Sequence, residues 1–147
     1  MPNPTKASAL TPALSERLQL IKPVNGYLTD LVGVYTPTDR VPDEAPKPYA
    51  LIRPVADART NQAAYEATRL RTYELELVFS KAVGEQALCD AHVDVLRALG
   101  FGQDQPERQF PGLVDEPDEA EFRWAQKGET THSITITLGV GYAEKYN

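Results

Sequence analysis

Strict alternation between apolar and polar residues in two stretches constrains the fold of this chain more than any other feature. In residues 71–79 the odd positions Tyr73, Leu75, Leu77 and Phe79 are apolar, and the polar residues Thr72, Glu74 and Glu76 alternate with them. In residues 131–142 one set of alternate positions is mainly aliphatic, and the other set is small and uncharged. A repeat of two is typical of a β-strand with one face in a core and the other in solvent. Both stretches are therefore predicted to be long strands.

Two segments show the three- and four-residue spacing of an amphipathic helix. Thr11 followed by Pro12 is a helix-start signal, because threonine caps a helix well and proline is tolerated at its first position. A first helix is therefore predicted over about 12–22. A second helix is predicted to open at Gly84 and Glu85, with Gly100 well suited to close it. The apolar stripes are Leu14, Leu18 and Ile21 in the first helix and Leu88, Ala91, Val95 and Leu99 in the second.

Shorter strands and irregular stretches fill the rest of the chain. Residues 31–35 and 49–53 are predicted to be short strands, the second of them ended by Pro54. Residues 57–67 lack a clear period and are predicted to be a loop, with a helical turn at 62–66 as one option. An exposed proline-rich loop is predicted over about 36–48, and an irregular segment over about 102–118. A hairpin follows, in which a strand at Phe122 and Trp124 is connected to the last long strand by a turn of about three residues at 127–129.

The order of these elements favours an α+β fold. Parallel sheets usually alternate strand and helix, whereas this chain has a helix, short strands, a long strand, a helix and a hairpin. We expect an antiparallel or mixed β-sheet of about four to five strands, with two helices packed on one face. At 147 residues the chain is expected to form a single domain, 1–147.

Charge and composition narrow the range of functions. The chain has 15 Lys and Arg against 21 Asp and Glu, which gives a formal net charge of −6. Such a protein is poorly suited to nonspecific nucleic-acid binding, which depends on neutralising phosphates. One cysteine excludes a disulfide framework within the chain. No apolar stretch reaches the roughly 20 residues that span a bilayer, and residues 1–6 lack signal-peptide features, so we expect a cytoplasm-like compartment and no membrane partner.

The polar face of the last long strand is a candidate contact surface. Its residues are small and uncharged, so another backbone can approach closely, and a long uncharged strand is an aggregation hazard in a free monomer. Threonine also suits the solvent face of a strand, which is the simpler interpretation. The two glycines favour contact, because glycine weakens a strand unless something packs against it. The candidate contact residues are Thr131, Ser133, Thr135, Thr137, Gly139 and Gly141.

Reactive groups are too few to indicate an enzyme. Cys89 and His92 are three residues apart on the second predicted helix, where a thiolate–imidazole pair or half of a zinc site is conceivable. A structural zinc site usually takes four Cys or His ligands, and His132 is the only further one in the chain. Packing roles are the simpler interpretation of all three residues. No P-loop, dinucleotide fingerprint or Gly-x-Ser-x-Gly motif is present, so no catalytic, metal-binding or cofactor-binding residue is predicted.

Acidic residues gather in the proline-rich loop and again just before the hairpin. The second group could bind a divalent cation or repel the phosphates of nearby DNA. A charge run is more often a solvated face. The candidate acidic residues are Asp39, Asp43 and Glu44 in the loop, and Asp115, Glu116, Asp118 and Glu119, followed by Glu121, before the hairpin.

Several segments, taken in order, point to one family. They are LIKPVNGYLTD at 20–30 after the first helix, the proline-rich loop leading to YALI at 49–52, YELELVF at 73–79 with the helix after it, and ITITLGVGY at 134–142. Together they resemble the tail terminator proteins of long-tailed bacteriophages, minor tail proteins that cap the tail tube. The resemblance covers most of the chain as an order of elements and a loose pattern, without one highly specific motif.

This resemblance implies an α+β subunit that forms a ring, expected to be a hexamer. The ring would cap the head-proximal end of the tail tube, stop tube polymerisation and provide the docking surface for the head connector. The implied partners are further copies of this chain, the tail tube protein and the head–tail connector protein, while DNA passes through the lumen without specific binding. The implied location is the phage tail of the virion, after assembly in the bacterial host cytoplasm.

Site roles follow from the same resemblance. The acidic residues named above become candidates for the lumen, and the polar face of the last strand becomes a candidate contact with a subunit or the tube. A Thr135→Arg or Thr137→Arg variant is then expected to fold but to form no ring.

Two other functions remain open at the level of sequence. A tail-completion or head–tail joining protein of the same assembly also forms rings of small α+β subunits. A small hydrolase or metal-dependent enzyme would instead need a pocket in which Cys89 or His92 meets Asp90 or Asp94.

Overall fold

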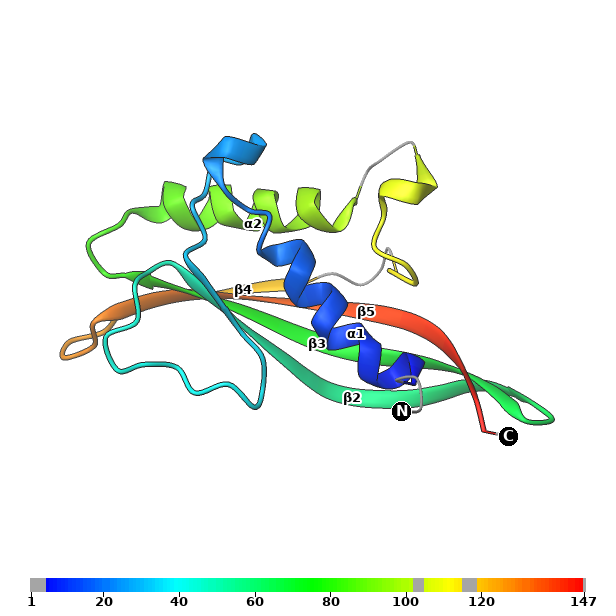
Figure 1. Ribbon diagram of the computed structural model, residues 1–147. Coiled ribbons are helices and arrows are strands. Elements are labelled where there is room, and N and C mark those ends of the chain that lie inside the picture. The colour runs from blue at the N-terminus through cyan, green and yellow to red at the C-terminus, as the bar shows by residue number, and fades with distance from the viewer. Residues whose placement is uncertain (1–4, 102–104, 115–118, 147) are drawn as a thin grey trace.

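The computed structural model describes residues 5–101, 105–114 and 119–146 and contains one mixed five-stranded sheet (Figure 1). The strands are β1 (Gly33–Tyr35), β2 (Tyr49–Ala63), β3 (Glu66–Ser80), β4 (Glu119–Arg123) and β5 (Thr131–Lys145). Their order across the sheet is β1-β2-β3-β5-β4. β1 pairs with β2 in parallel, and the other neighbouring pairs are antiparallel. The predicted α+β fold with a mixed sheet is therefore confirmed.

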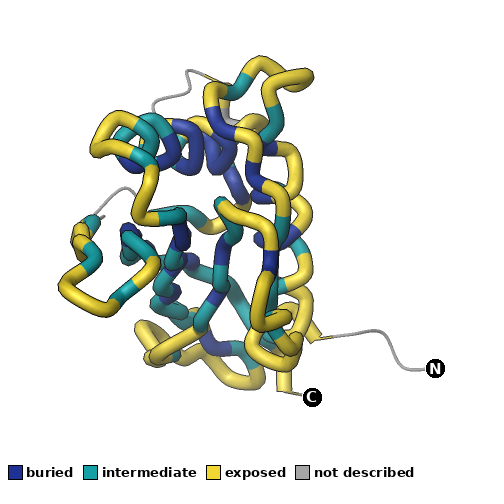
Figure 2. The backbone as a smooth tube through the Cα atoms, turned by 90° about the vertical axis from the view of Figure 1, so that its left-hand side faces the viewer, coloured by how far each residue is buried: buried dark blue, intermediate teal, exposed yellow. Residues whose placement is uncertain are grey.

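Both helices, α1 (Lys6–Leu18) and α2 (Glu85–Leu99), pack on the same face of the sheet, as predicted (Figure 1). The core lies between these helices and the apolar positions of β3 and β5. Figure 2 shows that buried residues gather where the helices meet the sheet, while the connecting loops are mainly exposed. The residues of both predicted stripes, Leu14, Leu18, Ile21, Leu88, Ala91, Val95 and Leu99, are all fully buried.

The start of α1 differs from the prediction. Its N-cap is Thr5, whose side-chain oxygen accepts a hydrogen bond from the Ser8 backbone N–H at 3.0 Å. A start at Pro12 is therefore wrong, and this proline lies inside the helix. The Thr11 hydroxyl, which was expected to cap the helix, instead hydrogen-bonds the Tyr73 hydroxyl in β3 at 2.8 Å. Thr11 therefore makes a contact with a distant strand instead of capping the helix.

The end of α1 also comes earlier than predicted. The helix stops at Leu18, and Lys22 has an extended backbone. Proline disfavours helical geometry in the residue before it, which accounts for the extended backbone of Lys22. Ile21 lies beyond the helix and is nevertheless fully buried, so the predicted stripe is correct in burial but only partly helical.

β2 continues through Pro54 and through residues 57–63, which were predicted to be part of a loop. β1 covers only the first three residues of β2, so from Ile52 onward β2 is an edge strand. At an edge, and next to the register shift that follows it, a proline can lie in a strand without breaking the sheet. The predicted loop over 57–67 and its helical turn at 62–66 are therefore wrong. Both faces of this part of β2 are mostly exposed, which removes the alternation that identifies other strands.

The hairpin between β4 and β5 is confirmed, but its connection is longer than three residues. Residues 124–130 link the two strands, and Gly128 has a φ of 89°, which glycine adopts readily. The Ala125 N–H donates to Nδ1 of His132 at 2.8 Å. This side-chain hydrogen bond shapes the connection after β4 has ended.

The predicted proline-rich loop is irregular, whereas residues 102–104 and 115–118 of the second predicted irregular segment lie outside the described residues. The proline-rich loop, residues 36–48, contains no helix or strand and is mostly exposed. In 102–118 the described residues include a 3₁₀ turn at Pro106–Arg108 and a β-bridge between Leu113 and Val140.

Candidate channel and contact surface

The sheet face that points away from both helices, called the outer face below, carries the predicted contact residues. In the middle of β5 the residues that point toward the helices, Ile134, Ile136, Leu138 and Val140, are buried almost completely, whereas most residues on the outer face are only half-buried. Within the described residues, both helices lie on the opposite side of the sheet (Figure 1). The outer residues of β5 are Thr131, Ser133, Thr135, Thr137, Gly139 and Gly141.

Four glutamates flank the threonines of this face. Pairing on both sides of β5 places Thr135 and Thr137 directly opposite a glutamate of β3 and a glutamate of β4. Because directly opposite residues in a sheet share a face, all four carboxylates belong to the outer face. These residues, called the glutamate quartet below, are Glu74 and Glu76 of β3 and Glu119 and Glu121 of β4.

The charge of the quartet is only partly compensated. Glu76 pairs with Arg53 of β2, with 3.0 Å between the carboxylate oxygen and the guanidinium nitrogen. Arg123 of β4 lies on the same face but pairs with Glu129 of the β4–β5 connection at 2.7 Å. Within the described ranges, Glu76 is the only quartet member in an ion pair. The uncharged row is therefore the centre of an acidic band, which repels both phosphates and an identical face.

The glycine end of the row is packed by the chain itself. A Cβ atom on Gly139 would lie 3.0 Å from a Leu70 methyl group and 3.8 Å from Val114. The Gly141 N–H donates to the Gly112 carbonyl at 2.7 Å. The approach of Leu70 accounts for glycine at Gly139 without a neighbouring subunit, whereas a Cβ on Gly141 would meet Gly112 and Arg69 at ordinary contact distances of 3.6 and 3.8 Å. The part of the row available to a partner is consequently centred on Thr135.

The predicted acidic residues do not form one cluster. Asp39 accepts hydrogen bonds from the backbone N–H and hydroxyl of Thr36, at 2.8 and 2.9 Å, and these bonds lower the pKa of its carboxyl. Asp43 and Glu44 are exposed in the same loop, at the β1–β2 edge, whereas Glu119 belongs to β4 at the opposite edge. Three further candidates, Asp115, Glu116 and Asp118, lie outside the described residues.

The reactive side chains considered for an enzyme have separate surroundings. Cys89 and His92 are both half-buried on α2, and His132 packs edge-on against the Trp124 ring at 5.1 Å between ring centroids. Asp94 is fully buried and accepts a hydrogen bond from the Thr29 backbone N–H at 2.7 Å. Among the residues that the structure describes, no group of three or more His, Cys, Asp and Glu side chains is arranged to hold a metal ion.

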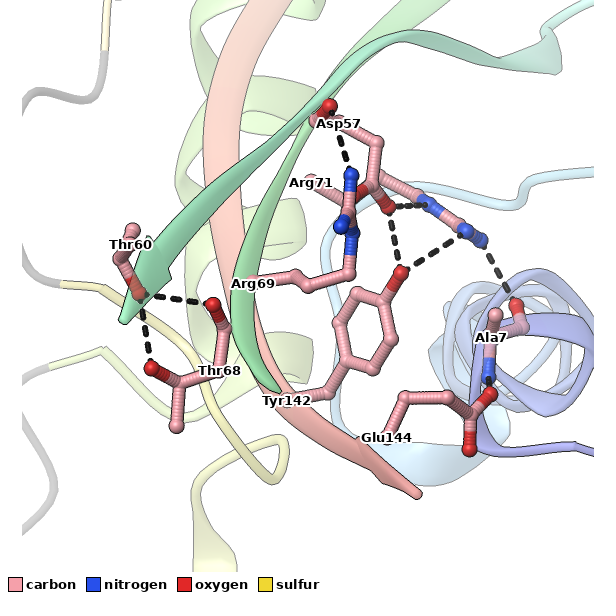
Figure 3. A network of polar contacts seen from close by, with 8 residues as sticks. All are labelled: Ala7, Asp57, Thr60, Thr68, Arg69, Arg71, Tyr142 and Glu144. Atoms are coloured by element: carbon pink, nitrogen blue, oxygen red, sulfur yellow. Dashed lines mark hydrogen bonds and ion pairs between the residues drawn. The ribbon is translucent and has the colours of Figure 1, made fainter. Parts of the chain in front are cut away.

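A polar network that joins β2, β3 and β5 was not predicted (Figure 3). Asp57 accepts hydrogen bonds from Arg69 at 2.5 Å, from Arg71 at 2.9 Å and from the Tyr142 hydroxyl at 2.6 Å. Burial acts to raise the pKa of Asp57, but the hydrogen bonds from Tyr142 and the two arginines outweigh it and hold this pKa below its ordinary value. Burial and the bond to Asp57 raise the pKa of Tyr142. The sequence signal was hidden because Asp57 fell in a predicted loop.

The same network reaches the start of α1. Arg71 donates to the Ala7 carbonyl at 2.7 Å, and Glu144 of β5 accepts a hydrogen bond from the Ala7 backbone N–H at 3.0 Å (Figure 3). A carboxylate is favourable at a helix N-terminus, where backbone N–H groups lack partners and the helix dipole is positive. Arg71 and Glu144 therefore fix the end of the sheet to the first turn of α1.

No family model matches the chain, and no curated protein matches it either. Among the described residues, no helix is both long enough and apolar enough to cross a bilayer. Function is therefore inferred from the resemblance in sequence and from the chemistry of the outer face.

Proposed function

We propose that this protein is a structural virion subunit that caps the head-proximal end of a phage tail tube. In this role a ring of copies stops tube polymerisation and provides the docking surface for the head connector. The observation that carries the proposal is the glutamate quartet on a sheet face that both helices leave uncovered (Figure 1). The resemblance to tail terminators supports the same role.

The sheet edges suit assembly into a ring. One edge is the part of β2 beyond Ile52, together with the short β1, and the other edge is β4. These edges differ in sequence and lie on opposite sides of the molecule. A contact between two different surfaces of the same chain is heterologous, and such contacts close into a ring when the rotation between copies completes a circle.

We assign the outer face to the channel wall. Two copies meeting through this face would bring two glutamate quartets together, and like charges opposite each other are unfavourable. The same negative charge is useful in a channel, because it repels DNA phosphates and prevents passing DNA from binding. Small threonines between the carboxylates add no bulk to the wall. The ring contacts then fall to the sheet edges.

Capping follows from shape rather than from catalysis. One end of the ring must match the last ring of the tube, and the other end must differ so that no further tube ring can add. Cys89 and His92 of α2 have no part in this mechanism. No cofactor or metal is required for it.

The purified protein is expected to form a ring of discrete size. Multi-angle light scattering should give a mass that is a fixed multiple of 16.2 kDa, with six copies expected from the resemblance. Negative-stain images of the protein mixed with tail tubes should show it at one end of each tube. Density at the head connector, with bare tube ends, would favour a head–tail joining role instead. A strictly monomeric protein that leaves tube ends unoccupied would contradict the proposal.

A Thr135→Arg variant distinguishes a channel wall from a subunit contact. The sequence alone predicts loss of the ring, but the flanking Glu76 and Glu121 change this expectation, because they can pair with the new guanidinium. We expect a folded protein that still forms rings and binds short duplex DNA several-fold more tightly at low salt, an effect that should fall as salt rises. Fluorescence anisotropy measures the binding.

A Thr135→Gln variant is the matched control for this experiment. Glutamine adds similar bulk without charge, so rings should form and DNA binding should stay at the wild-type level. Loss of ring formation in both variants would assign Thr135 to a contact between subunits and exclude the channel assignment.

A further inference from the structure

Two large aromatic side chains are exposed together at the β4 edge. Phe122 and Trp124 stack with nearly parallel rings, 5.9 Å between centroids and 11° between planes. They are 41% and 38% exposed, respectively. This pair is called the aromatic patch below. Single exposed apolar residues are ordinary, but two stacked aromatic rings are typical of the centre of an interface.

The aromatic patch is held in place from behind. The Trp124 ring packs against the edge of His132, and Nδ1 of His132 accepts the Ala125 N–H at 2.8 Å. The indole therefore sits on a side chain whose own orientation is fixed by the backbone. A rigid aromatic surface loses little conformational freedom when it binds, which favours association.

The chain also carries a segment of complementary chemistry. The proline-rich loop, residues 36–48, has exposed rings at Pro37, Pro42 and Pro46. Proline segments bind aromatic surfaces well, because their backbone is already restricted and their rings are flat and apolar. The patch and the loop therefore form a complementary pair on one molecule.

Their positions at opposite edges of the sheet favour contact between copies. Tyr49 of β2, Val78 of β3, Ser133 of β5 and Arg123 of β4 form one row across the sheet. The loop ends at Pro48, just before this row, and Trp124 follows directly after it. Loop and patch thus lie at the same end of the sheet but at opposite edges, which brings them together when copies are placed edge to edge.

The charges around the two surfaces are also complementary. The loop carries Asp39, Asp43 and Glu44 against Arg40 and Lys47, so it is net negative. The surroundings of the patch carry three positive side chains against two negative ones. The positive residues are Lys81, whose backbone N–H donates to the Thr130 carbonyl, Arg123 and Lys127, and the negative residues are Glu121 and Glu129.

We propose that the proline-rich loop of one copy packs on the aromatic patch of the next copy and forms the ring contact. This inference rests on the proposed function, because it identifies the surfaces through which that ring closes. Each subunit uses its loop on one side and its patch on the other, as a heterologous contact requires. The patch and the loop are thereby both covered in every subunit of a closed ring.

Cross-linking between two differently labelled preparations tests this contact. In a Cys89→Ser background, one preparation carries Thr38→Cys in the loop, and the other carries Gln126→Cys beside the patch; both positions are exposed. Treatment of the mixture with a short bismaleimide linker is expected to give the mixed dimer as the main product. Each preparation alone should give little dimer. Comparable dimer from the Gln126→Cys preparation alone would overturn the proposal.

Two variants show whether the patch itself makes the contact. Trp124→Ala, added to the Gln126→Cys chain, is expected to lower the yield of mixed dimer about tenfold or more. Pro42→Ser on the loop chain should lower it independently. The matched control is Tyr65→Ala, because Tyr65 is 67% exposed at the opposite end of the sheet and should leave the yield unchanged. Circular dichroism establishes that each variant is folded.

The outcomes separate this contact from the proposed function. Unchanged yield in folded Trp124→Ala and Pro42→Ser variants overturns the contact. Rings detected by light scattering without mixed-dimer cross-links overturn the contact and leave the ring in place. A protein that remains monomeric and gives no mixed dimer overturns both.

Discussion

Replacing Tyr73 with alanine is expected to lower the free energy of unfolding by about 3–5 kcal/mol. Tyr73 is fully buried in β3, between α1 and the sheet, and it is the largest of the fully buried side chains. Truncation removes the burial of an aromatic ring and leaves a cavity that the helix cannot fill without moving. Domains of this size are typically stable by about 5–15 kcal/mol, so urea unfolding should show a large shift of the midpoint.

Tyr73→Phe is the matched control for that prediction. It keeps the ring and removes only the hydroxyl that bonds Thr11 at 2.8 Å. The expected loss is about 0.5–1.5 kcal/mol, the usual net contribution of one hydrogen bond. Equal losses in the two variants would mean that the ring contributes little through packing, contrary to its position in the core.

Asp57→Ala should have the next largest effect, a loss of about 1–3 kcal/mol in the free energy of unfolding. The change leaves Arg69, Arg71 and the Tyr142 hydroxyl without the acceptor that they share (Figure 3). These side chains are only partly exposed, so water replaces the lost acceptor incompletely. Thermal unfolding of both proteins at pH 7 measures the difference. An unchanged melting temperature would contradict a structural role for the network.

The contribution of Asp57 should also depend on pH. Its pKa is lower in the folded protein than the ordinary value of 3.8, so near this pH the unfolded chain binds more protons than the folded one. The stabilisation is therefore complete above the ordinary pKa and is lost as pH falls through the folded value. Asp57→Asn, which keeps the shape but not the charge, should differ from wild type at pH 7 and approach it as the pH falls below the ordinary pKa of the carboxyl. A difference that grows on acidification would contradict this assignment.

The elements with strong two-sided patterns were predictable from sequence. β3, β5 and α2 each have one face in the core and the other toward solvent, so burial leaves a period of two or 3.6 in the sequence. The second half of β2 has no such pattern, because most of its side chains are exposed on both faces. Pro54 also favoured the wrong prediction that the strand ends there, because proline is excluded from central strands. Only the strand order of the sheet shows that this part of β2 is at an edge, where proline is tolerated.

The start of α1 was misjudged for a different reason. Thr5 and Thr11 both precede residues compatible with a helix, and the Thr11-Pro12 pair is the stronger local signal. The structure uses Thr11 to bind Tyr73, a contact between residues far apart in the chain. Local propensity cannot rank two caps when a tertiary hydrogen bond decides between them.

The candidate surface was predictable in part. The row of small residues on β5 could be assigned to one face from its period alone. Its acidic surroundings could not, because they depend on which residues of β3 and β4 lie opposite Thr135 and Thr137. The register between two strands is set when the sheet forms. The sequence pattern alone does not show which residue of β4 lies opposite which residue of β5. The stacking of Phe122 on Trp124 likewise depends on how the chain leaves β4.

The hydrogen bond between Glu144 and the Ala7 backbone N–H in the first turn of α1 has a practical consequence for labelling. It brings residues near both ends of the described chain to one corner of the molecule. The proline-rich loop and the aromatic patch lie at the other end of β3, roughly 45 Å away for an extended strand of 15 residues. A fluorescent reporter fused ahead of residue 5 or after residue 146 would thus leave from the same corner. Such a reporter would follow assembly in real time without obstructing the surfaces that are proposed to assemble.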